Sequence, residues 1–186
     1  MSTFLAALPL LALGYLFASL FLLAARKAGY SHRLHTISEI GESGAPDQVF
    51  VAWGLFFPIG ITFLLEAFLL RDTSPAISPL CACIAVGYLV AAVFPCDPGS
   101  PASGSNRQAV HNVGGAIEYI GGGFALLAAA ANFGTPARLA GYVVLAVAGA
   151  LTILPAGSSR GLAQRVGEIA LFGSASWLIW LSANDR

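Results

Sequence analysis

Residues 4–25 read FLAALPLLALGYLFASLFLLAA, an unbroken apolar run without a charged side chain. A helix that crosses a membrane needs roughly 20 mostly apolar residues, so this run is long enough to span a bilayer. The segment before it, Met-Ser-Thr, lacks the basic stretch with which a signal peptide begins. We therefore expect residues 4–25 to form a retained membrane helix.

Further apolar runs follow along the chain. They lie at residues 49–70, 77–94, 112–133, 137–155 and 166–182. The whole chain is 57% hydrophobic and only 10% charged, whereas soluble domains average about 25% charged residues. The sequence therefore predicts an all-α, polytopic membrane protein, a bundle of six transmembrane helices that forms one domain over residues 1–186.

The segments between these runs are polar or rich in glycine and proline, which interrupt helices. Those at 26–48, 95–111 and 156–165 are longer than the two that alternate with them. An even number of spans puts these three longer loops on one membrane face, which we call face B. Both chain termini are then expected on the opposite face.

The charge distribution bears on orientation and on partners. The basic residues of face B are Arg26, Lys27, Arg33, Arg107, Arg160 and Arg165, and those of the opposite face are Arg71, Arg138 and Arg186. Cytoplasmic loops carry an excess of Lys and Arg, so this bias predicts that face B is cytoplasmic. The formal net charge of +0 argues against a nucleic-acid partner, since phosphate binding needs a basic stripe.

The fourth apolar run carries polar residues at membrane depth, which are candidates for function because burying them is costly. Residues on one face of this helix, at steps of three or four, are His111, Gly114, Glu118, Gly122, Ala125 and Ala129. Glu118 would lie about 10 Å below His111 along the helix axis. The small residues beyond it either accept a lipid chain or let helices pack closely.

The longer loops hold further candidates. His35 and Glu39 are four residues apart, so a short helix would place both on one side, where they can ligate a metal or share a proton. An ordinary solvated loop explains the same spacing. Asp97 stands between Pro95 and Pro98 where the third apolar run ends, either as a site residue or as part of an Asx turn.

Other polar residues have simpler expected roles. Glu168 lies three residues after Arg165 and is expected to pair with it locally. Glu66 is expected to snorkel or to pair with Arg71 near the far end of the second apolar run, outside the site. The cysteines are interpreted as free thiols, because their spacing does not favour a disulfide. They are Cys81, Cys83 and Cys96.

Short motifs in the loops resemble a known family. In chain order they are Ile37-Ser38-Glu39-Ile40-Gly41, Phe94-Pro95-Cys96-Asp97-Pro98-Gly99, His111 and Gly161-Leu162-Ala163-Gln164-Arg165. Their order and their placement relative to the apolar runs resemble DUF998, a family of small membrane proteins with six helices. The resemblance implies a site at Ser38, Glu39, Asp97, His111 and Arg165, but it supplies no reaction.

The layout is also similar, more distantly, to the Frag1/DRAM/Sfk1 membrane proteins, which are associated with lipid handling. Those proteins are usually drawn with both termini in the cytoplasm. That arrangement would put face B outside, the opposite of what the charge bias predicts, so the orientation stays open.

Two main interpretations of the site remain. In the first, the protein binds or moves a membrane lipid, with Arg165, Ser38 and His35 on the head group and the small residues below Glu118 on the chain. In the second, it is an intramembrane hydrolase or transferase. Its catalytic residues would be His111, Asp97, Glu39 and Glu118, the first three acting as acid and base or holding a divalent metal such as zinc.

A third interpretation is an accessory subunit whose polar loops dock another membrane protein. A homo-oligomer is also open, because Tyr142, Ala146 and Ala150 form a stripe on the fifth apolar run that can pack against a second copy or inside one bundle. In each case the expected location is an inner (plasma) membrane of bacterial type.

Overall fold

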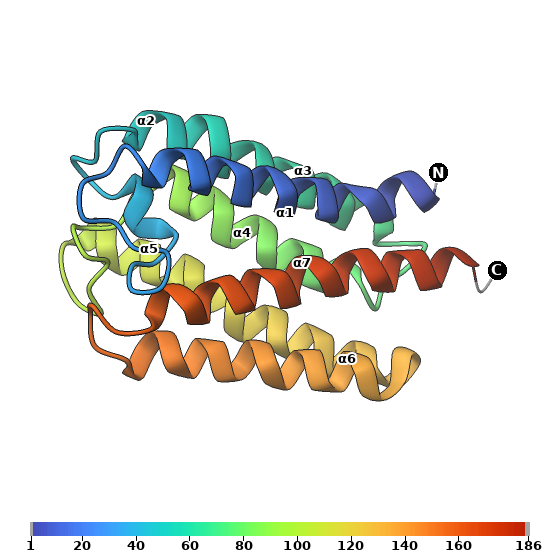
Figure 1. Cartoon of the computed structure of the whole chain (residues 1–186). Helices are drawn as coiled ribbons and strands as arrows, with labels where there is room; N and C mark the ends of the chain where they lie inside the picture. Colours follow the sequence, from blue (N-terminus) through green and yellow to red (C-terminus); the bar gives the residue numbers. More distant parts are fainter. Residues whose placement is uncertain (1, 185–186) are drawn as a thin grey trace.

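The computed structural model describes residues 2–184, and all the regular structure in that range is helical (Figure 1). Arg186 lies outside the described residues. The longer helices are α1 (Ser2–Ala24), α3 (Phe57–Leu70), α4 (Ser78–Val93), α5 (Asn106–Ala116), α6 (Gly122–Ile153) and α7 (Arg160–Asn184). The shorter elements are the 3₁₀ turn η1 (Ser38–Gly41), α2 (Gln48–Phe50) and two π-helical segments, η2 (Val51–Phe56) and η3 (Ile117–Gly121).

Among the described residues, four helical stretches are long and apolar enough to cross a membrane. They are Thr3–Ala24, Gln48–Leu70, Asn106–Ile153 and Arg160–Asn184. The chain is therefore an all-helical integral membrane protein, as the sequence predicts. The helix α4 is apolar but shorter than these four.

Two helices begin earlier than the apolar runs suggest. The fourth run was predicted from residue 112 and the sixth from residue 166, whereas α5 begins at Asn106 and α7 at Arg160. The first turns of both helices are polar, so hydropathy does not reveal them. Ser105 caps α5 by accepting a hydrogen bond from the Gln108 backbone N–H, which satisfies one of the free donors at a helix start.

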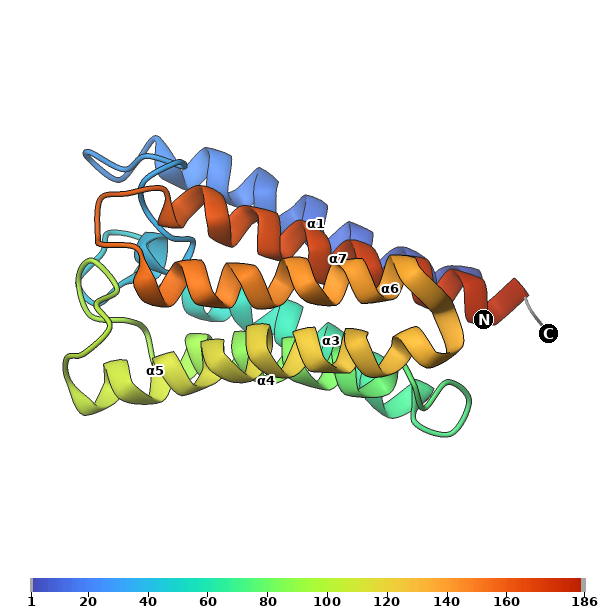
Figure 2. The ribbon, with the colours of Figure 1, turned by 90° about the horizontal axis from the view of Figure 1, so that it is seen from below.

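The stretch Asn106–Ile153 folds back on itself at Gly134, and its two arms lie side by side (Figure 2). Gly134 has φ 73° and ψ −156°, a backbone conformation that only glycine adopts readily. This turn lies in the short segment between the apolar runs at 112–133 and 137–155, where the sequence predicts an interruption. Because no residue outside a helix separates the two arms, the count of six separate helices remains a prediction.

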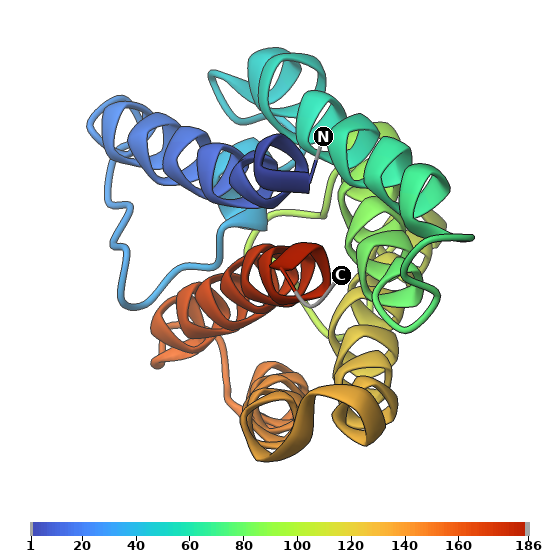
Figure 3. The ribbon, with the colours of Figure 1, turned by 90° about the vertical axis from the view of Figure 1, so that its right-hand side faces the viewer.

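The start of α1 and the end of α7 lie at one end of the bundle, and the three longer loops lie at the other, which is face B (Figure 1). Seen along the bundle, the helices surround a common core, with α7 in contact with α1, α4 and α6 (Figure 3). Phe63 and Phe172 meet in that core with ring centroids 4.7 Å apart. Large apolar side chains such as Phe21 and Phe124 face outward, as expected of a surface that faces lipid.

The predicted contact between Glu66 and Arg71 is wrong. Arg71 pairs instead with the exposed Asp72 at 3.0 Å, while Glu66 is fully buried in α3 and neither of its carboxylate oxygens has a hydrogen-bond partner among residues 2–184. Residues five apart on a helix point about 140° away from each other. One of these two side chains therefore faces the core when the other faces out.

Two minor expectations can be compared with the fold. The three cysteines are free thiols, as predicted. Tyr142 and Ala146 are exposed and Ala150 is half-buried, so this stripe faces outward rather than into the bundle. Whether a second copy covers it stays a prediction.

Candidate functional site

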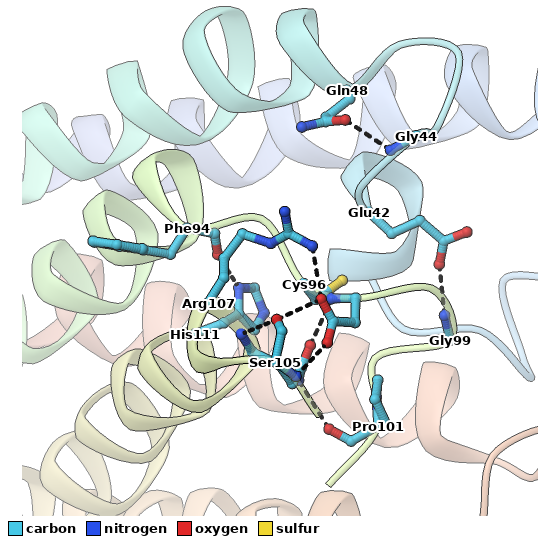
Figure 4. A network of polar contacts seen from close by, with 12 residues as sticks. Glu42, Gly44, Gln48, Phe94, Cys96, Gly99, Pro101, Ser105, Arg107 and His111 are labelled. Carbon is cyan, nitrogen blue, oxygen red and sulfur yellow. Dashed lines mark hydrogen bonds and ion pairs between the residues drawn. The ribbon is translucent and has the colours of Figure 1, made fainter. Parts of the chain in front are cut away.

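His111 and Ser38 meet at face B, although 73 residues separate them in the chain. The Nδ1 atom of His111 lies 2.8 Å from the carbonyl oxygen of Phe94 (Figure 4). A carbonyl only accepts hydrogen bonds, so Nδ1 carries the proton of the neutral ring. The lone pair of Nε2 then faces the Ser38 hydroxyl, whose Oγ lies 3.1 Å away. The serine therefore donates to the histidine.

Ser38 is held in place by the local structure of the first long loop. The Glu39 carboxylate accepts hydrogen bonds from the Thr36 backbone N–H at 2.8 Å and from the Thr36 hydroxyl at 3.1 Å. These bonds close the turn at η1, where Ser38 is the first residue. Glu39 thus lies next to the site, but its carboxylate points to Thr36.

Two other segments fix this turn from outside. The Gln164 side chain, on α7, accepts a hydrogen bond from the Ile37 backbone N–H at 2.7 Å. The Cys96 thiol, in the second long loop, donates to the Ser38 carbonyl at 3.4 Å. Burial raises the pKa of Cys96 to about 12, so Cys96 is a neutral thiol and a poor nucleophile.

Arg165 does not reach the Ser38–His111 pair. Its guanidinium donates to the His35 carbonyl at 3.2 Å, to the Tyr30 hydroxyl at 2.8 Å and to His32 Nδ1 at 3.0 Å. It therefore clamps the first loop onto α7. The expected ion pair with Glu168 is wrong, because no salt bridge joins these two residues within the described range.

His35 belongs to the same clamp. Its ring stacks on Tyr30 with centroids 5.5 Å apart, and its Nδ1 accepts a hydrogen bond from the Ser31 backbone N–H at 2.9 Å. The sequence predicts that His35 and Arg165 bind a head group together with Ser38. In the structure His35 and Arg165 lie next to each other, but neither bonds to Ser38. Burial, and then the charge of Arg165, lower the pKa of the neighbouring His32.

Asp97 fixes the start of α5. Its carboxylate accepts from the Ser105 backbone N–H and hydroxyl, each at 2.8 Å, and pairs with Arg107 at 2.7 Å. These contacts, the Ser105 backbone bond foremost, hold the pKa of Asp97 below its ordinary value. Asp97 therefore has structural partners, but not those of the predicted Asx turn, since the Gly99 backbone N–H donates to Glu42 instead.

The predicted metal set is not assembled. No group of three His, Cys, Asp or Glu side chains in residues 2–184 is placed to hold a metal ion. The physical reason is that each predicted ligand has another partner. Asp97 is taken by Ser105 and Arg107, Glu39 by Thr36, and His111 Nε2 by the Ser38 hydroxyl.

A cavity of about 250 Å³ opens beside Ser38 and His111, between the two arms of the 106–153 hairpin. Its polar lining is Thr36, Ser38, Ser100, His111, Asn112, Tyr119, Thr152, Arg160 and Gln164. Its apolar lining includes Ala116, Ile120, Ala148 and Leu151. Thr36, Ser38 and Ser100 come from the loops of face B, whereas Ala116 and Ile120 are exposed side chains of the first arm, so the lining combines polar groups of face B with apolar side chains of the membrane helices.

A second cavity, of about 20 Å³, lies on the other side of Ser38 and is lined by Glu118 and Glu168. Ser38 and Gln164 line both cavities. Glu168 accepts hydrogen bonds from Tyr88 at 2.9 Å and Tyr119 at 2.5 Å. Glu118 is buried, and its Oε1 has no hydrogen-bond partner in the described part of the chain. A cavity of this size holds about one water molecule.

The family model described as a protein of unknown function (DUF998) matches residues 10–183, nearly the whole chain. The chain belongs to the DUF998 family. No curated protein and no solved structure matches it. The motifs that carry this DUF998 resemblance meet in space, since Ser38 bonds His111 and accepts a bond from Cys96, while Gln164 accepts one from the adjacent Ile37.

The structure adds two residues, Arg160 and Gln164, that the sequence did not indicate as part of the site. Arg160 lines the cavity, donates to the Ser100 carbonyl at 3.0 Å, and has a buried Nε without a hydrogen-bond partner among residues 2–184. Gln164 was present in the last motif but had no predicted role. In the sequence, Arg160 contributes only to the charge bias between the two membrane faces, and no spacing pattern links it to His111.

The stripe below Glu118 packs against other helices. Gly122, Ala125 and Ala129 are all buried. A methyl group added at Gly122 would come within 2.8 Å of the Leu171 side chain on α7. This part of the helix therefore serves close packing, and the lipid chain predicted there has no space.

Proposed function

We propose that this protein binds a membrane amphiphile with an anionic head group in the cavity between the arms of the 106–153 hairpin. The observation that carries the proposal is the two-sided lining of that cavity. Polar groups from the loops of face B and Arg160 from the start of α7 line it together with apolar side chains of the hairpin arms, among them Ala116, Ile120 and Leu151. Such a mixed lining matches a molecule with a polar head and an apolar chain.

The size of the cavity fits part of such a molecule. Its volume of about 250 Å³ is at the small end of ligand pockets, which span roughly 300–1,000 Å³. The cavity therefore takes the head group and the first part of the chain, and the rest of the chain stays in the bilayer. Arg160 replaces the predicted Arg165 as the group that binds the head, because the donors of Arg165 are already used by the first loop.

We also propose a membrane topology, in which the chain of the amphiphile reaches the cavity from the bilayer. We place the chain in an inner (plasma) membrane of bacterial type, with six passes. The passes are α1, the stretch 48–70, α4, the two arms of 106–153, and α7. Support comes from the reversal at Gly134 and from the position of the three longer loops at one end of the bundle.

The test is amphiphile binding by the protein purified in mild detergent, with native mass spectrometry to identify retained lipid. Ala148→Phe fills the cavity and should abolish retention. Ala146→Phe is the matched control, since Ala146 is exposed on the same arm and does not line the cavity. Equal retention by both variants would refute the proposal.

A second pair of variants tests the charge. Arg160→Gln should weaken binding of an anionic amphiphile by about 10-fold or more, since hydrogen bonds to charged groups contribute roughly 1.5–3 kcal/mol. Arg33→Gln removes one positive charge from the same face at an exposed residue outside the cavity and should leave binding unchanged. A similar loss in both variants would show that the effect is general surface charge.

A further inference from the structure

We infer that Ser38 is a nucleophile and His111 its general base, and that the protein transfers the acyl group of a carboxylic ester. The substrate class, an acyl ester of an anionic amphiphile, rests on the proposed function. The dyad itself rests on the geometry of the two side chains.

The first argument is the direction of the hydrogen bond. The Phe94 carbonyl fixes the proton of His111 on Nδ1 and leaves the lone pair of Nε2 toward Ser38 Oγ at 3.1 Å. A serine hydroxyl becomes an effective nucleophile when an adjacent base accepts its proton, and a third group must orient that base. Here a backbone carbonyl provides the orientation that a carboxylate provides in other enzymes.

The second argument is access. Ser38 and His111 both line the larger cavity, so the pair borders the space in which the proposed ligand binds. Most of the remaining polar groups around them already have structural partners: Glu39 holds Thr36, and Cys96 is a buried neutral thiol bonded to the Ser38 carbonyl. Ser38 is the only hydroxyl in residues 2–184 for which the structure gives a bond to a histidine ring.

The reaction balances with water as the second substrate. Ser38 Oγ forms a bond to the ester carbonyl carbon while its proton moves to His111 Nε2. The bond from that carbon to the alcohol oxygen then breaks, and His111 returns the proton to the departing alcohol. Water next attacks the acyl-Ser38 ester, its proton passes to His111 and then to Ser38 Oγ, and the carboxylic acid leaves. No electrons are exchanged with a redox partner.

The experiment is covalent labelling of the full-length protein in mild detergent with a fluorophosphonate probe, in which Ser Oγ displaces fluoride at phosphorus. Peptide mass spectrometry should locate the adduct on Ser38. Labelling should be absent in Ser38→Ala and unchanged in Ser103→Ala, an exposed serine outside the cavity. In His111→Gln it should slow by about 100-fold or more, the usual range for loss of a general base being roughly 10²–10⁴.

Either of two results would overturn the inference: no adduct on Ser38 in monodisperse wild-type protein, or equal labelling rates in His111→Gln and wild type. Both can be measured even if Ser38→Ala fails to fold. Retention of amphiphile without labelling would leave the proposed function standing and remove the dyad. Labelling of Ser38 without amphiphile retention would keep the dyad and remove the substrate class.

Discussion

Gly161, in the first turn of α7, lies against the backbone of the first long loop. A methyl group added there would overlap the His35 carbonyl oxygen and come within 2.7 Å of the His32 carbonyl oxygen. These are backbone atoms, so they cannot move aside as the end of a flexible side chain can. We predict that Gly161→Ala destabilises the protein and loosens the loop that carries Ser38.

The expected size follows from the contacts that must move. Restoring an ordinary contact of 3.4 Å requires the His32 carbonyl to shift by about 0.7 Å. Such a shift strains the bonds that hold the loop, among them Leu162 N–H to the Arg33 carbonyl at 3.0 Å. Overpacking costs about 1–3 kcal/mol and a weakened hydrogen bond about 1 kcal/mol, against a gain of at most about 1 kcal/mol from replacing glycine in a helix.

The net loss in the free energy of unfolding is therefore about 2 kcal/mol, equivalent to roughly 4–8 °C in Tm at the usual 2–4 °C per kcal/mol for chains of this length. Thermal unfolding in detergent, followed by tryptophan fluorescence, measures it. Gly173→Ala is the matched control on the same helix, since a methyl group there meets nothing within 4 Å. If Gly161→Ala is as stable as Gly173→Ala, the packing argument for this loop is refuted.

Three further predictions concern polar residues. The pKa of Asp97 is lower in the folded state than its ordinary value. The contribution of Asp97 to stability is therefore complete above the ordinary pKa and is lost as the pH falls through the folded pKa. Tm should drop more steeply between about pH 5 and pH 3 in wild type than in Asp97→Asn. Tyr119→Phe removes a donor to Glu168 and should cost about 1–3 kcal/mol, whereas Tyr142→Phe, at an exposed position, should stay within about 0.5 kcal/mol by the same unfolding assay. Glu66→Met replaces a buried carboxylate without a partner among the described residues and should raise stability by about 1–3 kcal/mol; a lower Tm would mean that Glu66 has a partner or a proton that stabilises the bundle.

Apolar run length predicted the membrane class and most helix positions, because a spanning helix must be apolar whatever packs against it. The turn at Gly134 was also predictable, from glycine and proline together. The starts of α5 and α7 were not, because their first turns are polar and only the cap at Ser105 marks where α5 begins. Hydropathy locates the buried part of a helix and not its first hydrogen bond.

The site was predictable only in part. His111 and Ser38 were both candidates, but the contact between them depends on how the first long loop folds over α5. The choice of Arg165 over Arg160 shows the limit clearly. Five residues apart on α7, the two arginines point about 140° away from each other, so one joins the loop clamp and the other lines the cavity. Sequence spacing alone does not say which side of the helix faces the cavity.

The way Ser38 is fixed bears on the choice between binding and catalysis. Its turn is bonded by Gln164 from α7, by Cys96 from the second loop and by Lys27 from the end of α1, which donates to the Glu39 carbonyl. A head group in a membrane cavity tolerates movement of its contacts, because the lipid itself adjusts. A nucleophile and its base must be held to within about 0.5 Å by surrounding contacts. These bonds from three separate segments, two onto the turn and one onto the preceding Ile37, are more than head-group binding needs, and they are what a serine paired with a fixed histidine tautomer requires.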